Sequence, residues 1–246
     1  MRSAATAPPD RGALSGPVAG LGFIGGIGAA NALADLPYPR PGTDPADVRR
    51  YFTQNPGPTR LSAIGQAISA VALARFTASV ARLAGRTGRG SRALQTAAVA
   101  GGAVAAASLA ASAACTAALS GRWGRQDSAA AVARRGFLAG GVIHSPAFGI
   151  LVGALGLAGL RTGDLPRPVA ITALASASAS LLGPLYLVAE PMAWFIPAGR
   201  FPGLIVSGIA GAQLARGARP DRRAADIAPP PEGLIRQTRP GPTTEA

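Results

Sequence analysis

The only histidine of the chain, His144, is the first residue whose type and surroundings could do chemistry. It lies in the segment 140–146, which ends in Pro146 and is apolar apart from His144 and one serine. Because proline has no N–H, Pro146 cannot donate to the Val142 carbonyl, so a helix should kink here and expose an acceptor. A broken helix with an ionisable side chain at membrane depth is typical of proton or substrate sites in transporters. An ordinary bundle can also accommodate a proline in this way.

Three other polar residues in apolar runs complete a candidate intramembrane polar site with His144, namely Ser145, Arg75 and Gln66. Arg75 is the one strong charge well inside an apolar run, about 10 Å of helix from Arg82. Its long side chain could extend toward the membrane surface, or it could contact an anion or carboxylate within a bundle. No Asp or Glu lies at a matching depth in the sequence.

A second candidate site is a pair of opposite charges, Glu190 and Arg200, on either side of the turn-rich segment 191–197. The two side chains could pair across this segment at the outer membrane boundary. They could equally be two separate anchors in the solvated interface, and the spacing does not decide between these alternatives.

The segment 20–25 matches the G-x-G-x-x-G pattern of dinucleotide-binding proteins, and Asp44 follows at about the distance of a ribose-binding acid. That pattern needs a strand before it and a helix that begins within it, whereas here the glycines lie inside an apolar run. Gly22 and Gly26 form instead a small-xxx-small pair, which favours close packing of two membrane helices.

Catalytic and cofactor chemistry finds little support in the sequence. One cysteine, Cys115, and one histidine exclude an intrachain disulfide and any thiolate or multi-histidine metal cluster. No nucleophile and base pair, paired carboxylates or phosphate-binding loop occurs. We therefore expect no catalytic residue, no metal and no cofactor, and we expect that the protein is not an enzyme.

The elements that must position these residues are long apolar helices. Charged residues make up only 14% of the chain, against about 25% in soluble domains. A membrane span needs roughly 20 apolar residues, and a soluble alanine-rich bundle would show polar helix faces that are missing here. The sequence predicts an all-α polytopic transmembrane bundle with spans at about 12–34, 61–82, 93–120, 136–160, 168–189 and 201–215.

The arginines predict the orientation of the bundle, since short cytoplasmic loops are enriched in basic residues. With six spans, fourteen arginines lie on the side of both termini and nine on the other side. The composition, with 24 arginines and no lysine, is typical of a bacterium with a GC-rich genome. We expect a bacterial cytoplasmic membrane protein with both termini in the cytoplasm. Trp123 and Trp194 then fall at the outer boundary, where such rings concentrate.

The net charge of +13 does not predict nucleic-acid binding, because the arginines lie between apolar runs and do not form a basic face with aromatic residues. The bilayer is the expected partner. A homo-oligomer or a complex with another membrane protein is left open. The run ending in residues 32–34 could also be a secretory signal, since Ala32, Leu33 and Ala34 form an A-x-A cleavage pattern.

Three segments outside the spans carry further predictions. Residues 1–11 form a cytoplasmic arm, and residues 216–246, which are rich in proline and arginine, form a disordered cytoplasmic tail. In the first outer loop, Asp44 is a helix-capping acceptor followed by Pro45, so a short helix is expected at 45–54. Its apolar face would hold Val48, Tyr51 and Phe52 and would cap the bundle or offer a surface to a partner.

Two stretches, GLAGLRTGDLPR (residues 156–167) and RFPGL (residues 200–204) running on to Gly208, carry a family resemblance. The chain resembles a bacterial family of multi-pass membrane proteins described by a domain of unknown function. These motifs cover less than half of the chain. The resemblance implies a six-helix membrane bundle and supplies no catalytic residue.

The leading functional interpretation is a non-enzymatic accessory, sensory or structural component of the membrane. The alternative is a small transporter or channel that uses the kinked fourth span at His144, acting as an oligomer because six thin helices enclose little volume.

Overall fold

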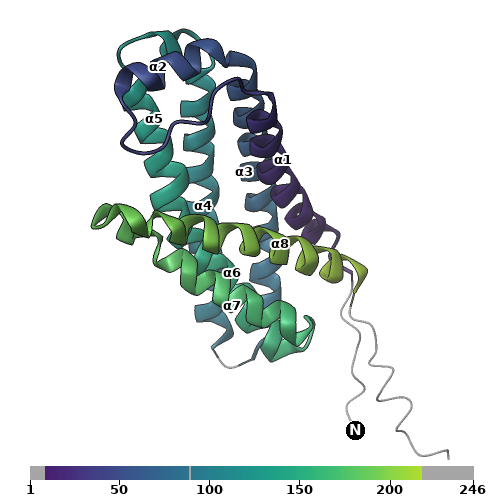
Figure 1. Cartoon of the computed structure of the whole chain (residues 1–246). Helices are drawn as coiled ribbons and strands as arrows, with labels where there is room; N and C mark the ends of the chain where they lie inside the picture. Colours follow the sequence, from purple (N-terminus) through teal and green to yellow (C-terminus); the bar gives the residue numbers. More distant parts are fainter. Residues whose placement is uncertain (1–8, 89, 218–246) are drawn as a thin grey trace, which may run out of the picture. The chain divides into compact units, whose positions relative to one another are not determined.

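The computed structural model describes residues 9–88 and 90–217, and the architecture within them is all-α, without a strand (Figure 1). A short 3-10 turn, Arg11–Leu14, leads into the first helix. The helices are α1 (Ser15–Leu33), α2 (Pro45–Gln54), α3 (Pro56–Gly85), α4 (Ser91–Leu119), α5 (Ala129–Phe137), α6 (His144–Thr162), α7 (Arg167–Leu181) and α8 (Phe195–Arg216). The predicted tail and most of the predicted N-terminal arm lie outside the described residues.

Six helical segments are long and apolar enough to cross a bilayer, which confirms the predicted number and order of spans. They are Arg11–Leu33, Pro56–Gly85, Ser91–Leu119, Ala129–Thr162, Arg167–Leu187 and Glu190–Arg216. Their outward faces carry large apolar side chains such as Leu21, Val71 and Ile205, all exposed. Contiguous apolar surface of this kind is suited to acyl chains rather than water. The chain is a polytopic integral membrane protein.

Prolines account for the main differences from the predicted span limits. Pro56 begins α3 instead of only ending α2, because proline is well accommodated in the first helical turn. The last span also begins earlier than predicted, with a 3-10 turn at Glu190–Trp194 followed by α8, in which Pro202 is internal. The fifth span ends its α-helix at Leu181 and continues as a 3-10 turn, Gly183–Leu187.

Small residues bring the helices into close contact. A Cβ placed on Gly65 of α3 would lie 2.5 Å from the Gly22 carbonyl oxygen and 2.7 Å from the Gly26 Cα of α1. A Cβ placed on Gly101 of α4 would likewise lie 2.8 Å from the Ala147 carbonyl oxygen of α6. Association of helices in lipid depends on such close packing, because burial of apolar surface gains little there. The predicted packing role of Gly22 and Gly26 agrees with this contact.

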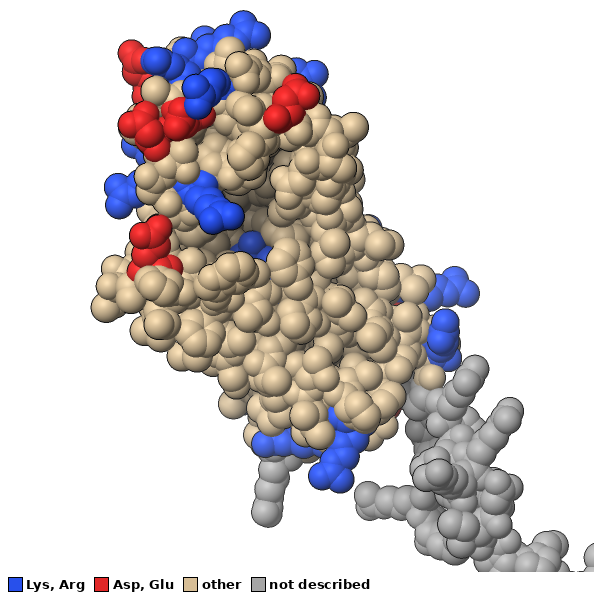
Figure 2. All heavy atoms as spheres, in the orientation of Figure 1, with Lys and Arg blue, Asp and Glu red and all other residues tan. Residues whose placement is uncertain are grey.

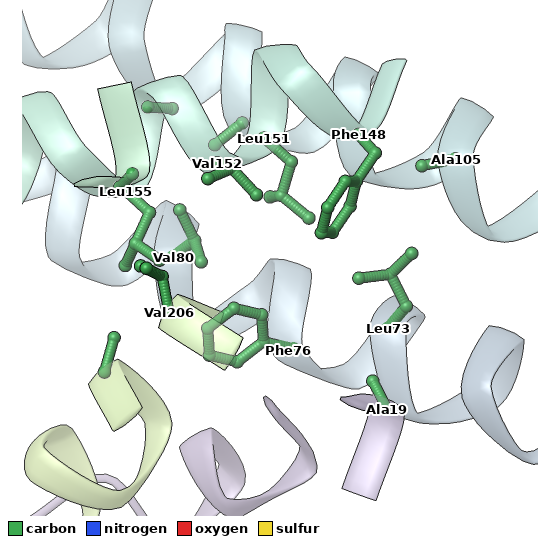
Figure 3. Close-up of a cluster of buried hydrophobic side chains, with 14 of the residues drawn as sticks. Ala19, Leu73, Phe76, Val80, Ala105, Phe148, Leu151, Val152, Leu155 and Val206 are labelled. Atoms are coloured by element: carbon green, nitrogen blue, oxygen red, sulfur yellow. The ribbon is translucent and has the colours of Figure 1, made fainter. Parts of the chain in front are cut away.

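Large apolar side chains from α3, α6 and α8 meet in one buried cluster (Figure 3). Phe76 of α3 and Phe148 of α6 are fully buried and lie in one cluster with Leu73, Leu151 and Val206. This cluster joins the second, fourth and sixth spans.

The outer loop folds as predicted. The Asp44 carboxylate accepts a hydrogen bond from the Ala46 N–H at 2.8 Å, and α2 occupies the predicted residues 45–54. Tyr51 and Phe52 of α2 are buried, and the Tyr38 ring meets both in edge-on contacts, at 5.4 Å from Tyr51. The loop between α1 and α2 is thereby held against α2.

Two ion pairs tie segments together at the opposite end. Asp10 accepts hydrogen bonds from Arg82 at 2.8 Å, and Arg86 pairs with Asp164 at 3.2 Å. Burial alone would raise the pKa of the Asp10 carboxyl, but hydrogen bonds from Arg82 and Ser79 and the Arg82 charge outweigh burial and hold this pKa below its usual range.

Candidate ligand-binding site

The half of the bundle that carries α2 contains a cavity of about 490 Å³. Residues of α1, α3, α4, α5 and α8 form its wall, and residues 38–43 of the outer loop lie along its rim. Figure 2 shows a hollow on this face, with charged side chains gathered above it, mostly uncharged surface below it, and a basic side chain inside it. The volume falls within the range of sites for small organic ligands.

Arg200 is the buried charge of this cavity, with only 8% of its surface exposed. Its Nη2 donates a hydrogen bond to the Gly140 carbonyl, and its guanidinium lies 5.0 Å from the centre of the Phe23 ring. Its Nε–H has no hydrogen-bond partner within the described part of the chain. The guanidinium therefore has one buried donor whose hydrogen bond is not made within the described residues.

The acceptor for Arg200 arises from an irregularity in the fourth span. Residues Leu138–Ile143 form a π-helical segment, η3, and the His144 N–H donates to the carbonyls of Ala139 and Gly141. In a regular α-helix that N–H would donate to the Gly140 carbonyl. The Gly140 oxygen can therefore accept from Arg200 instead. The sequence predicted an acceptor freed at Val142 by Pro146, but the one that is used lies two residues earlier.

Gly140 also brings α4 close to this segment. A Cβ at Gly140 would lie 2.7 Å from the Cβ of Ser112 and would overlap its hydroxyl. Ser112, Gly140 and Arg200 all line the cavity. Because α4 approaches the π-helical segment so closely, Ser112 lies beside the acceptor that Arg200 uses.

The cavity is positively charged. Its wall contains three arginines, Arg40, Arg134 and Arg200, and no Asp or Glu. Arg40 and Arg134 are exposed, and within the part of the chain that the structure describes Arg200 forms no ion pair. A buried cation without an acidic partner is costly. The arrangement favours an anion as the missing partner.

The polar side of the wall comes from α3 and α4. Thr59 and Thr116 donate to carbonyls of their own helices at 2.7 and 2.9 Å. Gln66 donates to the Ser62 hydroxyl at 3.2 Å, but its Oε1 has no partner among the described residues. The amide of Gln66 therefore keeps an unused acceptor, Oε1, and one N–H of its Nε2 beside the cavity.

The four predicted intramembrane residues do not form one site. Gln66 lines the cavity, whereas His144 and Ser145 are buried away from it. His144 is 2% exposed, with its Nδ1 2.9 Å from the Ala105 carbonyl and its ring stacked on Phe148 at 5.4 Å. Ser145 donates to the Ser180 carbonyl at 3.1 Å. Arg75 is exposed on the outer face of α3, where its side chain can extend along the lipid toward the membrane surface.

The predicted outer-boundary pair is not an ion pair in this structure. Glu190 is exposed near Gly42 at the rim, while Arg200 is buried beside Gly140. The reason is the early start of α8 at Phe195, which places Arg200 five residues, or about 7.5 Å, inside the helix. The charge itself was visible in the sequence, but the expectation of a span starting at residue 201 placed it outside the membrane.

Comparisons of the chain with protein-family models, curated proteins and solved structures gave no match. The proposal that follows therefore depends on the geometry of the cavity. Its wall holds three guanidinium groups, two side-chain amides and several hydroxyls but no imidazole or carboxylate. These groups can bind and orient an anion.

Proposed function

We propose that this integral membrane protein is a non-enzymatic component of the membrane, of accessory or sensory type, that binds an anionic ligand in its outer cavity. The observation that carries the proposal is the buried and unpaired guanidinium of Arg200 at the cavity wall. Ionisable side chains inside membrane spans are costly and usually mark functional sites. A bound anion would supply the missing charge and hydrogen bonds.

The proposed location is a bacterial cytoplasmic membrane with both termini in the cytoplasm. The excess of arginines on the side of the termini supports this orientation. Trp123 and Trp194 are exposed, and in the sequence both lie close to residues that line the cavity. Exposed tryptophan side chains are expected at the outer membrane interface. In this orientation the cavity faces the outer side of the membrane.

A small transporter or channel is the second candidate, and the π-helical segment beside the cavity is the observation that favours it. In that case the path would pass Arg200 and Gly140. His144 would not line it, because its ring lies outside the cavity wall and is packed against Phe148. Uptake of a bound anion into sealed vesicles would distinguish this candidate from a binding protein.

The proposal predicts that benzoate, but not neutral benzamide, raises the melting temperature of the purified protein. Ligand bound only by the folded state stabilises it by about 2.7 kcal/mol at a concentration of 100 Kd. Arg200→Gln should weaken benzoate binding at least about tenfold, since a hydrogen bond to a charged group contributes about 1.5–3 kcal/mol. The measurement is thermal unfolding in detergent over a range of benzoate concentrations.

Arg75→Gln is the matched control, because it removes the same charge from an exposed position outside the cavity wall. Arg200→Lys keeps the charge and should retain part of the effect. The unliganded melting temperature of each variant reports whether it is folded. Equal stabilisation by benzoate in the native protein and in folded Arg200→Gln would refute the anion site.

A further inference from the structure

The chemistry of the cavity wall differs between its helices. The walls from α1, the π-helical segment and α8 are mainly apolar, with Phe23, Ile27, Leu138 and Ile196. The remaining polar capacity is concentrated on Arg200 and Gln66. A ligand that fits this wall has one anionic end and an apolar body, because a wholly polar ion would leave the apolar wall without matching contacts.

The mouth of the cavity lies next to surface that faces lipid. Leu187 lines the cavity and is 64% exposed, and its neighbours Val188 and Trp194 are 86% and 78% exposed. All three lie in or between the fifth and sixth spans. In Figure 2 the hollow opens on the side of the bundle, between the charged upper part and the uncharged lower part of that face. A ligand could therefore enter sideways from the outer leaflet.

The arginines of the cavity divide into two kinds. Arg40 and Arg134 are exposed, so they attract anions to the mouth through their field without fixing them. Arg200 is desolvated, its Nε–H has no partner among the described residues, and a guanidinium can bind a carboxylate through two oxygens. The anionic end of the ligand therefore belongs at Arg200.

The size of the cavity decides between a one-chain and a two-chain amphiphile. A volume of about 490 Å³ lies in the range of single small ligands. The headgroup and both chains of a phospholipid would not fit in it. A single hydrocarbon chain can start at Arg200 and leave through the mouth beside Leu187.

Resting on the proposed anion-binding function, we infer that the ligand is a single-chain carboxylate amphiphile taken from the outer leaflet. Its carboxylate binds the Arg200 guanidinium, and its chain runs along Phe23 and Ile196 to the mouth at Leu187. The Gln66 Nε2, which donates one N–H to Ser62, has a second N–H that can donate to the head. The protein would thereby report or retain free long-chain carboxylates in the membrane.

The experiment uses the full chain in lipid nanodiscs, with empty nanodiscs to subtract partition into lipid. Binding of radiolabelled dodecanoate is measured and competed with unlabelled dodecanoate, dodecanol and benzoate. We expect one dodecanoate per chain, binding at least about tenfold tighter than benzoate, and no competition by dodecanol. Arg200→Gln should weaken dodecanoate binding at least about tenfold, and Arg75→Gln should leave it unchanged.

The outcomes separate the two proposals. Benzoate binding as tightly as dodecanoate would overturn the amphiphile and leave the anion site. Dodecanol competing as well as dodecanoate, with Arg200→Gln unchanged, would overturn both. Loss of dodecanoate binding when the disc lipid is changed to phosphatidylglycerol would overturn the single-chain carboxylate in favour of a phospholipid headgroup.

A pair of variants tests the path of the chain. Leu187→Asp places a negative charge in the mouth and should weaken dodecanoate binding at least about tenfold while changing benzoate binding less. Leu185→Asp is the control, because Leu185 is exposed on the same 3-10 turn but does not line the cavity. Equal effects of the two variants on dodecanoate would overturn the proposed mouth.

Discussion

Gly65→Leu is expected to destabilise the bundle by about 3 kcal/mol or more. Any side chain at this position meets the backbone of α1, at the Gly22 carbonyl oxygen and the Gly26 Cα. Backbone atoms cannot rotate away as a flexible side chain can, so α1 and α3 must separate along the contact. In a bilayer that separation removes the packing that holds the helices together. The loss of unfolding free energy is measured by titration with a denaturing detergent, with circular dichroism as the signal for unfolding.

Gly28→Leu is the matched control for this prediction. Gly28 lies on the same helix as Gly22 and Gly26, but a Cβ there meets no atom within 4 Å. Both variants add the same side chain and the same apolar surface. If Gly65→Leu unfolded at the same detergent concentration as Gly28→Leu, the close contact between α1 and α3 would be wrong.

His144→Ala is expected to cost about 3 kcal/mol of stability while leaving anion binding unchanged in the fraction that folds. The imidazole is buried and stacked on Phe148, so its removal leaves a space beside the interior cluster and loses the hydrogen bond to Ala105. The His144 side chain does not line the cavity, so anion binding should not depend on it. Thermal unfolding gives the stability, and the benzoate titration gives the binding.

His144→Phe keeps an aromatic ring at this position and should recover most of the stability. This variant also separates the structural role of the histidine from a role in transport or binding. If folded His144→Phe lost benzoate binding, or lost an anion flux that the native protein shows, the imidazole would belong to the functional site.

The spans and the outer helix could be predicted from the sequence because they depend on local patterns. Charge-free runs identify the spans, and Asp44 followed by Pro45 identifies the start of α2. The limits of the last span were less predictable, since prolines that usually end helices are here accommodated within α8. Because α8 begins earlier than predicted, Arg200 lies in the wall of the cavity and not at the predicted membrane boundary.

The cavity itself depends on tertiary packing that no local pattern contains. The sequence singled out Gln66 and Arg200 but assigned them to different sites, and it grouped Gln66 with His144. The place of Arg200 depends on a π-helical segment packed against α4, whose register shift frees the Gly140 carbonyl for its guanidinium. A shift of this kind follows from the balance of many contacts, so the proline alone predicts a break but not its position.

The central claim, an outward cavity that accepts anions at Arg200, is tested most directly by the reaction of one cysteine in its wall. With Cys115 replaced by Ser, Ser112→Cys places a thiol in the cavity beside Gly140. Anionic and cationic methanethiosulfonates are added to the outer side of oriented vesicles, and each rate is divided by its rate with a free thiol. We predict a preference for the anionic reagent of about tenfold or more, mostly lost with Arg200→Gln. A thiol that does not react from the outside, or that reacts at least as fast with the cationic reagent, would contradict the account.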